Sequence, residues 1–273
     1  MRFPKRWVVA ALAAVLLGAV AVLLVRAPVP AVSGPSTAAL TGPESAPHTH
    51  VMTAPSGAPV PVGGLSATAG GYSFVVTGMS PFTFHIQGPD GNPVTSVQLV
   101  HEKPLHLIVV RKDLSGYQHV HPTMAPDGTW TVALSLPAPG PYRAFADFTT
   151  GTGTAVVLGA ELPAVAGAAA APSTVDNAFP VTHEGTLTVG VAEPLLFRIG
   201  SKDPLQPYLG AYGHLTMLRE TDLAYLHIHP EPALVDGAAK FWVAAPSTGT
   251  FRLFLDYQVD GKVHTAQFTV TVR

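Results

Sequence analysis

The chain has 273 residues, a formal net charge of −2, only 12% charged residues, and 26 glycines and 27 prolines. This composition favours short strands and frequent turns over long charged helices, and the length suits two domains of about 100 to 150 residues. The absence of cysteine excludes disulfides, thiol catalysis, iron–sulfur clusters and cysteine-bound metal sites, and the absence of a basic stripe argues against a nucleic-acid partner.

The first 26 residues have the pattern of a membrane-targeting segment. Arg2, Lys5 and Arg6 precede an uncharged run at 7–25, and Arg26 follows it. A helix needs about 17 to 25 apolar residues to cross a bilayer, and the positive flank keeps the N-terminus in the cytoplasm. We therefore expect residues 1–26 to form a single-pass anchor with the bulk of the chain extracytoplasmic. A cleaved signal peptide, which would leave the protein secreted, stays open as the alternative.

Two stretches lack the large apolar side chains that a folded core requires. Residues 27–68 are rich in Pro, Ala, Ser, Thr and Gly, which predicts a disordered stalk, and residues 163–174 predict a linker of similar composition. The regions between and after them, 69–162 and 175–273, are the predicted domains.

Within both regions the sequence predicts β-strands. "TWTVALSL" (129–136) alternates apolar and polar residues, as a half-buried strand does, and "FTFHI", "LHLIVV" and "YRAFADF" are short runs bounded by turn-forming "PDGNP", "APDG" and "APGP". The second region repeats this plan with "LLFRIG", "HLTMLR", "KFWVAA" and "FRLFLDYQV", and no segment keeps a helical period. The predicted fold class is all-β, with two tandem antiparallel β-sandwich domains of immunoglobulin- or cupredoxin-like type after the transmembrane helix and stalk.

The two regions also align with each other in their polar motifs. "YQHVHP" (117–122) is matched by "YLHIHP" (225–230), and "PGPYRAFADF" (139–148) is matched by "TGTFRLFLDY" (248–257). A further histidine precedes the first histidine of each pair by 13 residues. The chain is therefore interpreted as a tandem duplication.

The spacing of the repeated histidines predicts a metal site in each domain. Alternate residues on a strand share a face, so each His-x-His pair can converge, and the earlier histidine can join the pair from a neighbouring strand. Three imidazoles form a ready site for copper or zinc. The candidate ligands are His106, His119 and His121 in the first domain and His214, His227 and His229 in the second.

Two aspartates lie at equivalent positions after the motifs. Asp147 and Asp256 are candidates as ligands or as acceptors that orient a histidine ring. Arg143 and Arg252 share their strand faces, and the favoured interpretation is that each aspartate forms an ion pair with the arginine of its own strand.

The remaining candidates are weaker. His48 and His50, with Met52, are considered as a loose copper-collecting tether, whereas Tyr117, Tyr225 and His264 are interpreted as packing residues. His85 and His101 have no counterpart in the second domain. No GxSxG motif, paired-carboxylate motif or phosphate loop is present, so we expect no enzyme.

The strings "YLGAYGHLTMLRETDLAYLHIHP" (208–230) and "HLIVVRKDLSGYQHVHP" (106–122) resemble a group of exported bacterial two-domain proteins with HxHP motifs, described as heavy-metal or copper-associated. A looser likeness to CopC- and YtkA-type periplasmic sandwiches implies copper handling.

Together these features predict a membrane-anchored extracytoplasmic protein that buffers copper or zinc or delivers it to a membrane transporter or another envelope protein. The alternative is an extracytoplasmic interaction module in which the repeated histidines are structural.

Overall fold

The structure is a computed structural model, and it describes residues 63–136, 138–165, 175–228 and 231–273. The predicted membrane segment at 7–25, most of the predicted stalk and most of the predicted linker lie outside these ranges. Within the described ranges, no helix is long and apolar enough to cross a bilayer. The all-β prediction and the tandem sandwich prediction are confirmed, because the strands form four antiparallel sheets, two in each half of the chain.

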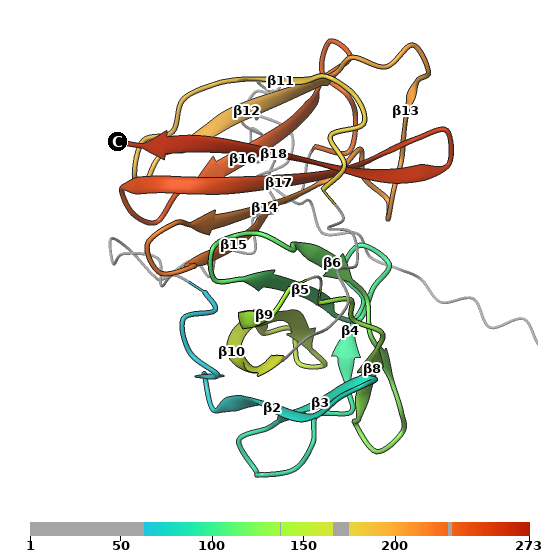
Figure 1. The fold of residues 1–273 in the computed structure, drawn as a ribbon, viewed down its shortest axis with the longest axis vertical. Helices are drawn as coiled ribbons and strands as arrows, with labels where there is room; N and C mark the ends of the chain where they lie inside the picture. The colour runs from blue at the N-terminus through green and yellow to red at the C-terminus, as the bar shows by residue number, and fades with distance from the viewer. Residues whose placement is uncertain (1–62, 137, 166–174, 229–230) are drawn as a thin grey trace, which may run out of the picture. The chain divides into compact units, whose positions relative to one another are not determined.

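The first repeat, from β1 to β10, consists of two sheets (Figure 1). One has the strand order β1-β2-β3-β8-β7, and the other has the order β10-β9-β5-β6, with β4 also paired to β9. The strands of the first sheet are β1 (Thr68–Ala69), β2 (Tyr72–Met79), β3 (Phe82–Gln87), β7 (Thr123–Met124) and β8 (Trp130–Val132). Those of the second sheet are β4 (Val97–Gln98), β5 (His106–Arg111), β6 (Gln118–Val120), β9 (Gly140–Thr150) and β10 (Ala155–Val165).

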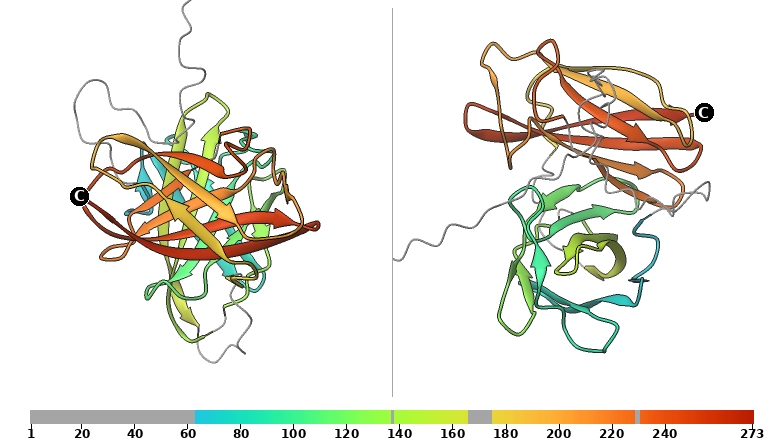
Figure 2. Two further views of the ribbon diagram at one scale, coloured as in Figure 1. Left: turned by 90° about the horizontal axis from the view of Figure 1, so that it is seen from above. Right: turned by 180° about the vertical axis from the view of Figure 1, so that it is seen from behind.

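The second repeat, from β11 to β18, follows the same plan. One sheet has the order β11-β12-β16, and the other has the order β13-β17-β14-β15, with β18 paired to β17. The strands are β11 (Val181–Glu184), β12 (Ala192–Ile199), β13 (Leu205–Gln206), β14 (His214–Arg219), β15 (Tyr225–Ile228), β16 (Ala239–Ala244), β17 (Gly249–Val259) and β18 (Lys262–Val272). Figure 2 shows the long β17–β18 hairpin, in red, running across this repeat.

Each repeat has its own apolar core between its two sheets. Phe84 and Trp130 face Leu107 and Ala144 in the first repeat, and the rings of Phe84 and Trp130 stack with centroids 6.1 Å apart. Strand alternation explains this core, because every second residue of β3 is buried.

Strand β5 does not alternate in this way, because His106 and the four apolar residues after it are all buried. A third apolar cluster, formed by residues of both repeats, covers the second face of the strand. In this cluster Tyr117 stacks on Phe254 with ring centroids 4.0 Å apart, and Phe145 stacks on Tyr225 at 5.1 Å. The outer faces of β5-β6-β9 and β14-β15-β17 therefore contribute to one shared apolar interior. The sequence did not predict this contact between the repeats.

Residues 63–68, assigned from the sequence to the disordered stalk, take part in this packing. Gly63 forms a β-bridge with Tyr225, and Arg143 donates to the carbonyl of Gly64 through Nη2 at 2.6 Å. Gly64 has a φ of +72°, and a Cβ built on it would lie 2.5 Å from Cδ1 of Phe145. The position requires glycine because both the backbone conformation and the space exclude a side chain.

Candidate metal centre

The histidines of the first repeat lie on one hairpin. His106 begins β5, His119 lies in β6, and His121 follows β6 directly. Leu107 pairs with Val120 in this hairpin, so the next position places His106 opposite His121. Val120 packs on the core of the repeat, as its alternation with the histidines predicts.

The three imidazoles converge through one ring nitrogen each. His106 Nδ1 lies 3.1 Å from His119 Nε2 and 3.2 Å from His121 Nε2, and all three nitrogens lie within 4.8 Å of one another. In a tetrahedral zinc site with bonds of about 2.0 to 2.1 Å, two ligand nitrogens are separated by about 3.3 Å. The spacing of this histidine triad (His106, His119 and His121) therefore fits three nitrogens around one transition-metal ion.

The other ring nitrogens of two of these histidines are held by acceptors. His106 Nε2 donates to the carbonyl oxygen of Val100 at 3.1 Å, and His119 Nδ1 donates to Asp256 Oδ2 at 2.7 Å. In the neutral tautomers that these bonds select, His106 Nδ1 and His119 Nε2 both present lone pairs. Two lone pairs 3.1 Å apart repel each other unless a cation, either a proton or a metal ion, lies between them.

Asp256 belongs to the second repeat, so both repeats build the site. Its carboxylate is buried, and it also accepts a hydrogen bond from Thr265 Oγ1 at 2.6 Å. The favoured ion pair with Arg252 is wrong, because Arg252 pairs with Glu220 and Asp256 faces His119 instead. Asp256 contacts the ring of His119, and its role as an acceptor that orients a metal-binding histidine stays a prediction. A carboxylate that accepts from one ring nitrogen of a histidine, while the other nitrogen faces further histidines, is an arrangement found around many metal sites.

Burial favours the neutral form of two histidines of the triad, His106 and His121. It lowers the pKa of His106 well below the ordinary value, and the neighbouring His119, His121 and His214 lower it further. Burial, together with His119 and Lys103, lowers the pKa of His121 to about 3. Neutral imidazole is the form that binds a metal ion, so these shifts favour coordination over protonation.

The second repeat reproduces the backbone arrangement of the first. His106 pairs with Asp147 across β5 and β9, and His214 pairs with Asp256 across β14 and β17. His214 Nε2 donates to the carbonyl oxygen of Tyr208 at 3.1 Å, as His106 does to Val100. The backbone of His227 in β15 pairs with Thr216 in the register of His119. The side chain of His227 and all of His229 lie outside what the structure describes, so these two ligands remain predictions.

His214 is nevertheless a neighbour of the first repeat's triad. Its ring centroid lies 5.9 Å from that of His106 and 5.8 Å from that of His119. Burial lowers the pKa of His214 well below its ordinary value, and His119 lowers it further. The sequence predicts His214 in a separate site, whereas the structure brings it beside the triad.

His101 was assigned no role from the sequence but also lies at this centre. Its ring meets that of His214 edge to face, with centroids 5.7 Å apart. The signal available in the sequence was its position five residues before His106.

The tyrosines of the two motifs pack as predicted, and they also donate hydrogen bonds between the repeats. Tyr117 donates to Thr216 Oγ1 at 3.0 Å, and Tyr225 donates to Asp147 Oδ2 at 3.2 Å. His264 is buried between the rings of Phe179 and Tyr257. It is therefore a packing residue, as predicted, and it also contacts Asp176 at 2.7 Å. His48 and His50 lie outside the described residues.

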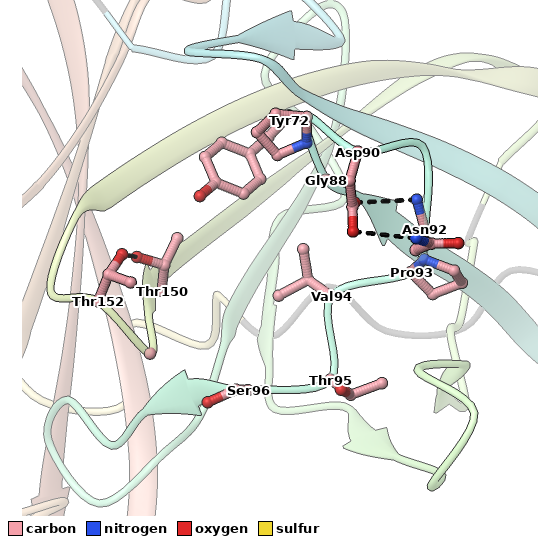
Figure 3. A pocket seen from close by; sticks show the side chains of 12 residues that line it. Tyr72, Gly88, Asp90, Asn92, Pro93, Val94, Thr95, Ser96, Thr150 and Thr152 are labelled. Atoms are coloured by element: carbon pink, nitrogen blue, oxygen red, sulfur yellow. Dashed lines mark hydrogen bonds between the residues drawn. The ribbon is translucent and has the colours of Figure 1, made fainter.

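A groove of about 590 Å³ lies elsewhere on the first repeat, between two turns (Figure 3). Its polar groups bond mainly to each other, as when Asn92 Nδ2 donates to Asp90 Oδ2 at 2.9 Å. None of the predicted site residues lines it. The groove is therefore separate from the histidine centre, which lies where the two repeats meet.

Comparison with known proteins gives a family but no activity. Residues 61–161 and 173–273 each match the family model described as Domain of unknown function (DUF8832). No curated protein matches the chain.

Similar solved structures include multidomain proteins of low identity. The FN1–FN3 domains of chicken CNTN1 are 12% identical over 74% of this chain and 66% of that chain, with a TM-score of 0.24. Dimeric latent PorU from Porphyromonas gingivalis is 9% identical over 75% of this chain and 18% of that chain, with a TM-score of 0.23. The BSP domain of a biofilm-associated protein is 8% identical over 74% of this chain and 50% of that chain, with a TM-score of 0.24. The chain thus spans less than two thirds of the length of each, and these similarities carry no functional argument.

Proposed function

The chain belongs to the family described as Domain of unknown function (DUF8832), and for this member we propose a metal-binding function centred on the histidine triad. The ion is copper or zinc, and the role is buffering it or delivering it to a partner in the envelope. The convergence of three ring nitrogens in the first repeat is the observation that supports this proposal most directly.

The arrangement of charge at the triad also supports a bound cation. Asp256 is 3% exposed, and it accepts hydrogen bonds from His119 and Thr265, which are both neutral donors in the tautomer described above. A buried carboxylate is costly unless positive charge compensates it. A divalent ion on the far nitrogen of His119 would supply that charge through the ring.

The chemistry of the donors narrows the class of ion. Neutral imidazole suits zinc and copper, whereas magnesium and calcium prefer oxygen ligands. With three protein ligands the fourth position is left for water or an exchanging ligand, which suits a protein that passes its ion on. The proposal assigns no catalytic step to the centre.

The location is part of the same proposal. Residues 7–25 would anchor the chain in the cell membrane and leave both repeats extracytoplasmic, where a metal transporter or another envelope protein could receive the ion. His214, a candidate ligand of a separate second-repeat site with His227 and His229, lies beside the triad, so the proposal is limited to the centre at the triad.

The test is calorimetric titration of the full-length chain in detergent with Zn(II) and Cu(II) at neutral pH. The decisive variant replaces His106, His119 and His121 by Ala, and the matched control is His85→Ala, a histidine on β3 outside the centre. Saturable binding that the triple variant loses and the control keeps is the expected result. Equal binding by the parent, the triple variant and the control would refute the triad as the metal site. No binding by any of them would favour a structural role for the histidines.

A further inference from the structure

More histidines gather at this centre than one ion requires. Besides the triad, His214 lies with its ring centroid 5.9 Å from His106 and 5.8 Å from His119, and His101 lies 5.7 Å from His214. His101 belongs to the first repeat and His214 to the second. These two side chains therefore form a pair across the repeats, directly beside the triad.

His214 is prepared for coordination in the same way as His106. The Nε2–H of each ring donates to a backbone carbonyl six residues earlier, at 3.1 Å in both repeats. This bond selects the tautomer with the lone pair on Nδ1. In His106 that nitrogen, Nδ1, faces the other nitrogens of the triad. Nδ1 is the equivalent nitrogen of His214, a residue that is 1% exposed.

His101 is presented by a tight turn. Val100 and Lys103 exchange backbone hydrogen bonds of 2.9 and 3.1 Å, which leaves His101 and Glu102 as the two central residues of a hairpin turn. Their φ values are +46° and +64°. Such angles are unfavourable for residues other than glycine, and they cluster at ligand and active sites. The corresponding turn of the second repeat has Leu209 and Gly210 at these positions.

The buried carboxylates can offset more than one cation. Asp256 lies opposite His214 in the sheet and accepts from His119, while Asp147 lies opposite His106. Both aspartates are 3% exposed. Two buried carboxylates, each opposite a histidine of the centre in its sheet, provide negative charge of the kind that neighbouring divalent ions require.

From this arrangement we infer that the centre binds a pair of metal ions across the two repeats, the second ion on His101 and His214. The inference rests on the proposed function, since it assumes that the triad holds the first ion. With a metal–nitrogen bond of about 2 Å, each ion lies about 3 Å from the centroid of an imidazole that binds it. The ring centroids of His119, a ligand of the first ion, and His214, a ligand of the second, are 5.8 Å apart. The two ions are therefore separated by about 12 Å or less.

The experiment uses Cu(II) and the full-length chain in detergent, with His48 and His50 replaced by Ala so that they bind no copper. Copper per chain and the electron paramagnetic resonance spectrum are measured for this protein, for His101→Ala, for His214→Ala and for the control His85→Ala. His101 is only partly buried, so His101→Ala keeps the test informative if His214→Ala fails to fold.

The expected result is two coppers per chain with a spectrum broadened by coupling between them, and the control is unchanged. In His101→Ala the count falls to one and a sharp mononuclear spectrum appears. If the parent binds one copper and His101→Ala does not change this count, the paired centre is overturned while the triad stands. Two uncoupled coppers overturn it as well, and no copper in any protein refutes the proposed function together with this inference.

Discussion

The contact between Asp256 and His119 gives the sharpest test of how the two repeats cooperate. The perturbation is Asp256→Asn, which keeps the shape of the side chain and removes its charge. Asp256 Oδ2 lies 2.7 Å from His119 Nδ1, and the two side chains are 5% and 3% exposed. Solvent therefore cannot replace the lost interaction, and the effect should appear in metal affinity.

The expected magnitude follows from the kind of bond that is changed. A hydrogen bond to a charged group contributes about 1.5 to 3 kcal/mol, and loss of a partner that orients a metal-binding histidine costs about 10- to 100-fold in affinity. A factor of 10 equals about 1.4 kcal/mol, so the two figures agree. We expect zinc affinity to fall about 10- to 100-fold.

The stability of the metal-free protein should respond differently. A buried charge costs desolvation energy, so its replacement by a neutral group of the same shape is often neutral or stabilising. The assay is calorimetric zinc titration together with urea unfolding in the presence of chelator. Asp260→Asn serves as the control, because Asp260 is an exposed carboxylate in the turn between β17 and β18. Unchanged zinc affinity in Asp256→Asn would falsify the orienting role, and a large loss of metal-free stability would identify a purely structural one.

Further predictions concern pH, metal removal and Gly64, which packs against Phe145. The pKa values of His106, His121 and His214 lie below 6.5 in the folded protein. As the pH drops below about 6.5, these three side chains therefore gain protons in the unfolded chain before they do so in the folded one. Urea titrations of the metal-free protein should show stability falling by up to about 1.4 kcal/mol per pH unit for each of these histidines, down to about pH 3 for His121. The triple alanine variant should flatten this profile. Chelation of zinc present at 100 times its dissociation constant should remove about 2.7 kcal/mol and lower Tm by about 5 to 10 °C in thermal denaturation, whereas the triple variant should not respond. Gly64→Ala should lower the free energy of unfolding in urea by about 1 to 3 kcal/mol, because the new Cβ would meet Phe145. Gly91→Ala is the control: Gly91 also has a positive φ, but a Cβ there would meet no atom within 4 Å, so the difference between the two variants measures the clash.

The sequence predicted those features that depend on local spacing. Alternation and turn residues located the strands, and the period of two placed His119 and His121 on one face, with Val120 directed to the core between them. The 13-residue interval before His119 led to the prediction that His106 would join from the preceding strand. The structure agrees, since Leu107 of β5 pairs with Val120 of β6.

The contacts between the repeats could not be predicted in this way. Asp256 and His119 are 137 residues apart, and nothing near either residue indicates the other. Arg252 is close to Asp256 on the same strand face, so the local pattern favoured the wrong partner. One local signal was present, because "HLIVV" in β5 lacks the alternation of a half-buried strand, and a continuous apolar run indicates a strand covered on both faces.

The dependence of the site on both repeats follows from what a single sandwich can offer. On the outer face of one isolated sheet, three histidines would be solvated and would protonate near their ordinary pKa, in competition with any metal ion. Packing of the second repeat buries His106 and supplies the carboxylate that orients His119. The stacked pairs Tyr117–Phe254 and Phe145–Tyr225 belong to the apolar cluster formed by both repeats. Duplication therefore provides the histidine face of the first repeat with a complementary partner surface, because the copied strand brings Asp256 to the position where His119 needs an acceptor.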